Sequence, residues 1–251
     1  MEIFILGFFT IGYLVLAGAD IGVGMLLPYL GRSADERREV ITSIAPFFLG
    51  NEVWLVAAAG VLAGLFPELE GTLLTGNYLA VVALLAGWVV RDMGLWLRGR
   101  VDGPHWRLCW DGAIVAGSWT LALSWGAILS GILVEPLTGL VAALATVAVA
   151  ALFATHGLSF AGLRLRGELR ARAVRPTGAA DERGTYALTA AALAALGVLA
   201  GIRLPLAASA ADAGTLALLV PVILVLIPFL VLSQAWVWWT FRHRVSGPSY
   251  L

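Results

Sequence analysis

The residues IFILGFFTIGYLVLAGADIGVGMLLPYL, from Ile3 to Leu30, form an apolar run that contains a single carboxylate, Asp20. A helix needs about 20 apolar residues to cross the hydrocarbon core of a bilayer, so this run predicts a membrane-spanning helix. A carboxylate at that depth costs at least about 2.5 kcal/mol unless it is paired, hydrated or protonated. Asp20 therefore indicates a functional site. The alternative is that it only caps the helix or fixes it against a neighbour.

The composition of the whole chain is that of a polytopic membrane protein. Hydrophobic residues make up 60% of the 251 positions and charged residues only 13%, and the mean hydropathy is +0.91. Such values lie far from those of soluble domains. We predict an all-α helical bundle in a single transmembrane domain, residues 1–251. The first run has no basic leader and no small-residue cleavage site, so we interpret it as a retained helix and not as a signal peptide.

Several classes of protein are excluded by residues that the chain lacks. All 16 basic residues are Arg, so no Lys is present to form the Schiff base of a retinal protein. The single Cys109 argues against an iron–sulfur cluster or a structural zinc site, and we expect no metal site. A net charge of zero with scattered Arg gives no sign of a nucleic-acid partner.

The hydrophobic runs predict seven membrane spans. They lie near residues 3–30, 42–66, 76–98, 110–134, 137–163, 185–203 and 214–241. We expect a tight turn at Glu135–Pro136 and kinks in the last span at Pro221 and Pro228.

The distribution of Arg predicts the orientation, because basic residues concentrate in cytoplasmic loops. With the N-terminus outside and the C-terminus cytoplasmic, 15 of the 16 basic residues lie on the cytoplasmic side, and only Arg203 does not. The cytoplasmic residues are Arg32, Arg37, Arg38, Arg91, Arg98, Arg100, Arg107, Arg164, Arg166, Arg170, Arg172, Arg175, Arg183, Arg242 and Arg244. An odd number of spans agrees with this arrangement.

Two polar groups besides Asp20 interrupt the predicted spans. Asn51 and Glu52 enter the second span together, followed by Trp54. A buried Glu52 could relay protons, whereas at the interface it would be an ordinary acid at a helix start. Arg91 and Asp92 lie near the cytoplasmic end of the third span. At that depth Arg91 needs an anion, such as Asp20, Glu52, a lipid phosphate or a heme propionate, unless it snorkels to the interface.

His156 is the only histidine within a predicted span. It could ligate a heme, but no second intramembrane ligand accompanies it, so a hydrogen-bonded structural role is the simpler interpretation. From the residues alone, a supporting subunit, a channel, a heme-binding anchor and a proton-coupled small-solute transporter all remain open. In the transporter, Asp20, Glu52 and Arg91 would line the permeation route.

Five motifs occur in the order and spacing of subunit II of the cytochrome bd-type quinol oxidases, which this chain resembles. They are Asp20-Ile21-Gly22-Val23-Gly24-Met25-Leu26; Arg37-Arg38 with Ile44-Ala45-Pro46; Gly50-Asn51-Glu52-Val53-Trp54-Leu55; Trp106-Arg107 with Trp110-Asp111; and Thr155-His156-Gly157 with Arg164 and Gly167-Glu168. The resemblance runs from about residue 10 to residue 172, and the Trp-rich last span is similar to the family's last helix.

The resemblance implies a subunit of a respiratory-chain oxidoreductase in the bacterial plasma (inner) membrane. Its partner, subunit I, would carry heme b and heme d-type hemes and the quinol site, and this chain would ligate no heme. Quinol oxidation is then coupled to dioxygen reduction to water, with protons supplied from the cytoplasm. Membrane lipids, quinone and a small single-helix accessory subunit are further partners in such complexes. The candidate residues for the proton path or the heme environment are Asp20, Asn51, Glu52, Trp54, Arg91 and Asp92.

The chain departs from the family pattern at three places. Ala17 replaces an Asp, and Phe48-Leu49 replaces a Trp-Asp pair, so one carboxylate of the family's proton path is absent. Since Leu49 and Glu52 are three residues apart and share a helix face, we hypothesise that Glu52 takes over that role. The family usually has nine spans, and residues 203–214 stand in for two helices, which predicts a truncated second bundle.

Overall fold

The computed structural model describes residues 1–134, 139–178, 181–245 and 247, and every regular element in this part of the chain is an α-helix. The predicted turn at Glu135–Pro136 lies outside the described residues. The helices are α1 (Glu2–Met25), α2 (Leu27–Leu30), α3 (Ala34–Ile44), α4 (Phe48–Leu65), α5 (Pro67–Gly76), α6 (Tyr78–Leu97), α7 (Pro104–Leu133), α8 (Leu140–Arg164), α9 (Gly167–Val174), α10 (Glu182–Arg203) and α11 (Ala213–Thr240).

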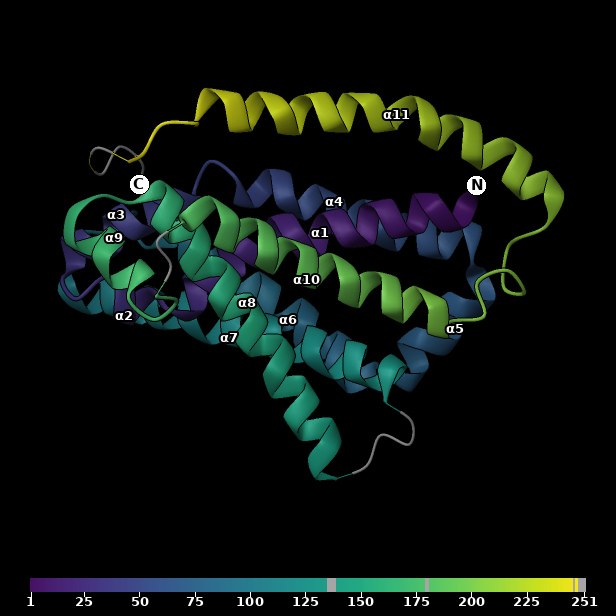
Figure 1. Cartoon of the computed structure of the whole chain (residues 1–251), viewed down its shortest axis with the longest axis horizontal. Coiled ribbons are helices and arrows are strands. Elements are labelled where there is room, and N and C mark those ends of the chain that lie inside the picture. The colour runs from purple at the N-terminus through teal and green to yellow at the C-terminus, as the bar shows by residue number, and fades with distance from the viewer. Residues whose placement is uncertain (135–138, 179–180, 246, 248–251) are drawn as a thin grey trace.

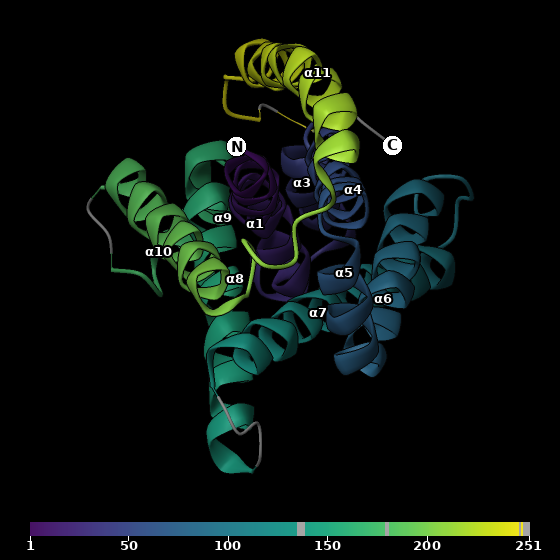
Figure 2. The same cartoon turned by 90° about the vertical axis from the view of Figure 1, so that its right-hand side faces the viewer.

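Seven of these helices are long and apolar enough to cross a membrane: α1, α4, α6, α7, α8, α10 and α11. The predicted all-α fold with seven spans is therefore confirmed. Helix α1 is central, because it contacts α4, α7, α8 and α10, and Figure 2 shows it surrounded by them. Helix α6 packs mainly on α7. Helix α11 lies on the outside of the bundle, beside α4 (Figures 1 and 2).

The ends of the first two predicted spans differ from the structure, and prolines explain both differences. The helix predicted for 3–30 ends at Met25, and Pro28 lies in the first turn of the short helix α2. The span predicted for 42–66 begins only at Phe48, after Pro46, and residues 34–44 form the separate α3. A proline lacks the backbone N–H and clashes with the carbonyl four residues earlier, so it breaks or kinks a helix, and at these two positions the helix is broken.

The other differences are smaller. Helix α7 begins at Pro104 and not at residue 110, since a proline suits the first helical turn. Helix α10 begins at Glu182, where the side chain of Asp181 caps it by accepting from the Arg183 backbone N–H. Helix α11 contains Pro221 and Pro228 within one continuous helix, and Figure 1 shows that its axis curves.

The basic segments gather at one end of the bundle. Figure 1 places α2, α3, α9 and the C-terminal segment at this end, and the N-terminus and α5 at the other. The N-terminus and the end of α11 therefore lie at opposite ends of the bundle, as an odd number of spans requires. We call the first the Arg-rich end. That it faces the cytoplasm stays a prediction.

Glycines allow the helices around Asp20 and Arg91 to approach closely. A Cβ atom on Gly157 of α8 would lie 2.2 Å from the carbonyl carbon of Gly22 on α1. A Cβ on Gly117 of α7 would lie 2.7 Å from the Cβ of Arg91 on α6. No side chain larger than hydrogen fits at either contact. The backbone of α1 therefore packs directly against that of α8, and the backbone of α6 against that of α7. The first contact lies two residues from Asp20 and the second at Arg91 itself.

Candidate functional site

A buried group of charged side chains joins α1, α4 and α6. Arg91 of α6 forms ion pairs with Asp20 of α1, with Glu52 of α4 at 3.3 Å and with its neighbour Asp92 at 3.2 Å. The Arg91–Asp20 pair is the most enclosed, since each side chain is 2% exposed. The Arg91 guanidinium also lies 5.9 Å from the centre of the Phe48 ring, which adds a cation–π contact. We call these four ionisable residues the carboxylate–Arg91 cluster.

The cluster holds three carboxyl groups around one guanidinium. One positive charge does not neutralise three negative charges, and uncompensated charge in a low-dielectric interior is costly. The arrangement is therefore suited to holding a proton on one of the carboxyl groups. Glu52 and Asp92 share one Arg91 nitrogen, Nη1, and are 12% and 20% exposed. Both are more accessible than Asp20 and better placed to exchange a proton with a neighbouring group.

A chain of neutral polar groups holds the second oxygen of Asp20. Asn51 Nδ2 donates to Asp20 Oδ2 at 2.7 Å and to the Leu16 carbonyl at 3.0 Å. Asn51 Oδ1 in turn accepts from Gln234 Nε2 of α11 at 2.9 Å. Trp54 Nε1 donates to Gln234 Oε1 at 3.4 Å. The indole packs over Gly12 of α1, where a Cβ atom would lie 2.2 Å from the ring.

All six candidates from the sequence thus lie in one connected site: Asp20, Asn51, Glu52, Trp54, Arg91 and Asp92. Sequence reasoning did not find Gln234. The signal was present, because Gln234 is the only amide side chain in α11. Leu49, three residues before Glu52 on α4, is 48% exposed, whereas Glu52 is buried.

His156 lies fully buried in α8, apart from the cluster. Its Nε2 lies 2.9 Å from the Val15 carbonyl, and its Nδ1 lies 2.8 Å from Thr189 Oγ1 of α10. A carbonyl only accepts, so in the neutral ring Nε2 carries the proton and Nδ1 accepts from the Thr189 hydroxyl. Tyr186 stacks on the ring with centroids 4.6 Å apart. With both nitrogens bonded, His156 is a structural histidine and does not fit an axial heme ligand.

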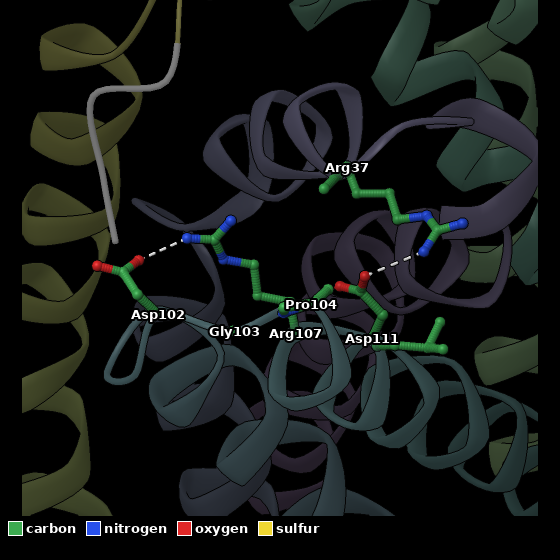
Figure 3. A pocket seen from close by; sticks show the side chains of 8 residues that line it. Arg37, Asp102, Gly103, Pro104, Arg107 and Asp111 are labelled. Atoms are coloured by element: carbon green, nitrogen blue, oxygen red, sulfur yellow. Dashed lines mark hydrogen bonds and ion pairs between the residues drawn. The ribbon is translucent and has the colours of Figure 1, made fainter.

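A second set of ion pairs lies at the Arg-rich end. Asp111 of α7 accepts from Arg98, the residue that follows α6, and, at 3.2 Å, from Arg37 of α3. A pocket of about 590 Å³ is lined by residues of this group, among them Arg37 and Asp111. Figure 3 shows its lining, with Arg107 directed at Asp102. The charges in this pocket are paired with one another, at 2.6 Å in the case of Arg107 and Asp102. The set therefore joins α3, α6 and α7.

Glu36 makes a further link at this end, outside the membrane spans. Its carboxylate accepts two hydrogen bonds from Arg172 of α9, at 2.6 and 2.8 Å, and one from the Arg32 backbone N–H at 2.7 Å. Ser33 caps α3 by accepting from the Glu36 backbone N–H. The hydrogen bonds from Arg172, followed by that from Arg32, lower the pKa of Glu36 from 4.5 to about 2.

A profile of the cytochrome bd terminal oxidase subunit II family matches residues 1–208, which include the whole carboxylate–Arg91 cluster. The chain belongs to this family. Gln234 and the rest of α11 lie beyond the matched residues.

Three curated relatives illustrate the similarity. The chain is 32% identical over 220 residues to cytochrome bd-I ubiquinol oxidase subunit 2 of Escherichia coli K12, covering 79% of this chain and 56% of the relative. It is 33% identical over 177 residues to cytochrome bd ubiquinol oxidase subunit 2 of Bacillus subtilis, covering 65% and 52%. It is 38% identical over 123 residues to a probable cytochrome oxidase subunit 2 of Haemophilus influenzae, covering 49% and 32%. The chain spans about half the length of the first and second of these relatives.

Proposed function

We propose that this subunit II family member packs against a larger, heme-bearing subunit I in the bacterial inner membrane. The complex oxidises quinol and reduces dioxygen to water, and this chain helps to supply the protons from the cytoplasm. The hemes, of b and d type, belong to the partner and supply the redox chemistry. Lipids, quinone and a small single-helix accessory subunit complete the expected partners. Support comes from the family match and from relatives named as subunits of ubiquinol oxidases.

The observation that carries the proton role is the charge imbalance of the carboxylate–Arg91 cluster. Arg91 Nη2 holds Asp20, and the two more accessible carboxyl groups, Glu52 and Asp92, share Arg91 Nη1. A proton held at either carboxyl group reduces the excess negative charge by one unit. When the proton leaves that carboxyl group, the group becomes a carboxylate again, and Arg91 stabilises its charge. Cycling between these two forms requires little movement of the backbone, because the helices are fixed by glycine contacts.

The surface beside this cluster is apolar and supports a protein partner there. On α4, Leu49 and Val53 are both 48% exposed, and on α6, Val89 is 56% and Met93 is 44% exposed. Glu52 and Asp92 lie on the same two helices, and their side chains are 12% and 20% exposed. In lipid alone a proton leaving either carboxyl group would have no acceptor, so we infer that subunit I covers this surface and receives the proton. The exposed apolar residues are then interface residues.

The described residues do not support a heme within this chain. His156 has both ring nitrogens bonded, and the remaining histidines, His105 and His243, are exposed at the Arg-rich end. No group of three or more His, Cys, Asp or Glu that could hold a metal is found where the structure describes the chain. The transporter alternative gains no support either, since each of the seven long helices is continuous over its described length.

The expected truncated second bundle corresponds to the connection between α10 and α11. Helix α10 ends at Arg203 and α11 begins at Ala213. In this short connection the Ala211 backbone N–H donates to the Leu65 carbonyl at 2.8 Å, which fixes the connection to the end of α4. We propose that this connection replaces helices that the longer relatives have here.

The test is to purify the tagged chain from its native membrane with its partners. We expect a co-purifying larger subunit, heme bands in the reduced-minus-oxidised absorbance spectrum, and quinol-driven oxygen uptake. A colourless preparation without oxygen uptake would contradict the proposal. Heme bands that remain with the chain after the partner has been removed would contradict the assignment of the hemes to subunit I.

A further inference from the structure

Gln234 is the only residue of α11 that is buried in the bundle, at 8% exposure. The rest of the helix lies along the outside of α4. Two glycines of α4 allow this approach: a Cβ on Gly50 would lie 3.3 Å from Gln234 Oε1, and one on Gly64 would lie 3.2 Å from Leu219. A polar amide in an otherwise apolar helix is thus placed directly against the site.

The hydrogen bonds around Gln234 have a fixed direction. An indole N–H only donates, so Gln234 must turn its oxygen, Oε1, toward Trp54. Its Nε2 then faces Asn51 and donates to Asn51 Oδ1. Asn51 must therefore turn its Nδ2 toward Asp20, where it donates to the carboxylate. The direction runs from a group that only donates, the indole, to one that only accepts, the ionised carboxylate.

We propose that Gln234 is a positioning residue that orients the Asn51 amide and thereby keeps Asp20 ionised. This inference rests on the proposed function for its effect on turnover. Without Gln234, Asn51 Oδ1 loses its donor, and only the Leu16 carbonyl and Asp20 itself still hold the amide, so its reversed orientation, with the oxygen toward the carboxylate, becomes more populated. An acceptor facing an acceptor disfavours the charged form, so Asp20 would take up a proton. Asp20 would then no longer balance Arg91, and the proton would be held at the wrong carboxyl group of the cluster.

Other groups around Asp20 act on its charge, and the test must separate them. Arg91 and Asp92 face it from α6, and Glu52 faces it from α4. Tyr13 on α1, Tyr186 on α10 and His156 on α8 are the further titratable side chains on the helices packed against it. None of these bonds to Gln234 in the described residues, so a change at Gln234 reaches Asp20 through Asn51.

The experiment compares the Gln234→Leu variant with wild type and with Ser233→Ala as the matched control. Ser233 is the exposed neighbour on α11, and its hydroxyl donates only to the Leu230 carbonyl of its own helix. Infrared difference spectra of the purified protein report protonated carboxyl groups by their C=O band. We expect this band to increase at neutral pH in Gln234→Leu and to disappear when Asp20→Asn is added. The acid limb of the pH profile of oxygen uptake should shift by about one pH unit toward higher pH.

A second variant covers the case in which Gln234→Leu does not assemble. Trp54→Phe keeps a ring over Gly12 but removes the donor that orients Gln234, so we expect a smaller change in the same direction. Unchanged infrared spectra and pH profile in an assembled Gln234→Leu, or in Trp54→Phe if the former is lost, would overturn the inference. The infrared result does not depend on oxygen uptake, so it decides the role of Gln234 even if the oxidase function fails.

Discussion

Replacing Arg91 by Met should destabilise the folded protein severely. The guanidinium is 2% exposed and is the cation that holds Asp20, which is itself 1% exposed. Removing one member of such a pair leaves an uncompensated buried charge, which costs about 3 to 5 kcal/mol. We expect the free energy of unfolding to fall by an amount in the upper part of this range, because Glu52 and Asp92 lose the same cation.

The assay is unfolding of the purified protein by sodium dodecyl sulfate in mixed micelles, followed by circular dichroism. A double-mutant cycle with Asp20→Asn isolates the pair. The double variant, which lacks both charges, should be less destabilised than the sum of the two single variants. We expect a coupling energy between Arg91 and Asp20 of about 2 kcal/mol. Arg100→Met is the matched control, since Arg100 is exposed and its Nε donates only to the Trp96 carbonyl. This control should lie within about 0.5 kcal/mol of wild type. An Arg91→Met variant as stable as the control, with no coupling to Asp20, would refute the reasoning.

Four further predictions concern other parts of the molecule. Glu52→Gln should slow quinol-driven oxygen uptake by at least about tenfold, since a proton-exchanging carboxyl group is lost. Gly157→Ala should lower the free energy of unfolding by more than about 2 kcal/mol, because its Cβ would lie 2.2 Å from a backbone atom of α1. Glu36→Gln should remove a contribution to stability that is present above pH 4.5 and lost as the pH falls toward about 2, because the pKa of Glu36 is lowered in the folded state. A C-terminal tag should be accessible to a protease only from the cytoplasmic side.

Each of these has a control or an outcome that contradicts it. Glu68→Gln, exposed at the end of the bundle opposite the Arg-rich end, should leave oxygen uptake unchanged. Normal uptake in an assembled Glu52→Gln protein would reject its role. Gly112→Ala, where a Cβ meets nothing within 4 Å, should not destabilise the protein, and an equal loss in both glycine variants would contradict the packing argument. Identical pH dependence of wild type and Glu36→Gln between pH 4.5 and 2 would rule out the Arg172 effect. Cleavage of the tag from outside would reverse the predicted orientation.

The seven spans could be predicted from the sequence because length and hydropathy alone define them. Their ends could not be placed as well. Pro28 and Pro46 lie in apolar surroundings, so hydropathy runs through them although the backbone hydrogen bonding does not. Local backbone chemistry, not polarity, ends α1 and delays the start of α4.

The candidate site could be predicted in part. An Arg within a span requires an anion, and this requirement named Asp20 and Glu52 as partners of Arg91. Which face of a helix points inward was harder to predict, because lipid and protein interior are both apolar and the usual periodicity is weak. The sequence therefore could not show that Glu52 is buried while Leu49, three residues before it, is 48% exposed. Gln234 was missed because its partner, Asn51, lies 183 residues away in the sequence.

The placement of α11 also has a consequence for how the protein is made. Domains fold from the N-terminus during synthesis, so the six earlier spans enter the membrane before α11 leaves the ribosome. Until then the amide oxygen of Asn51 and the indole of Trp54 lack the partner that they have in the finished protein. A chain cut short before Gln234 would keep these groups unsatisfied at membrane depth. Insertion of α11 is thus the step that satisfies the Asn51 amide oxygen and the Trp54 indole.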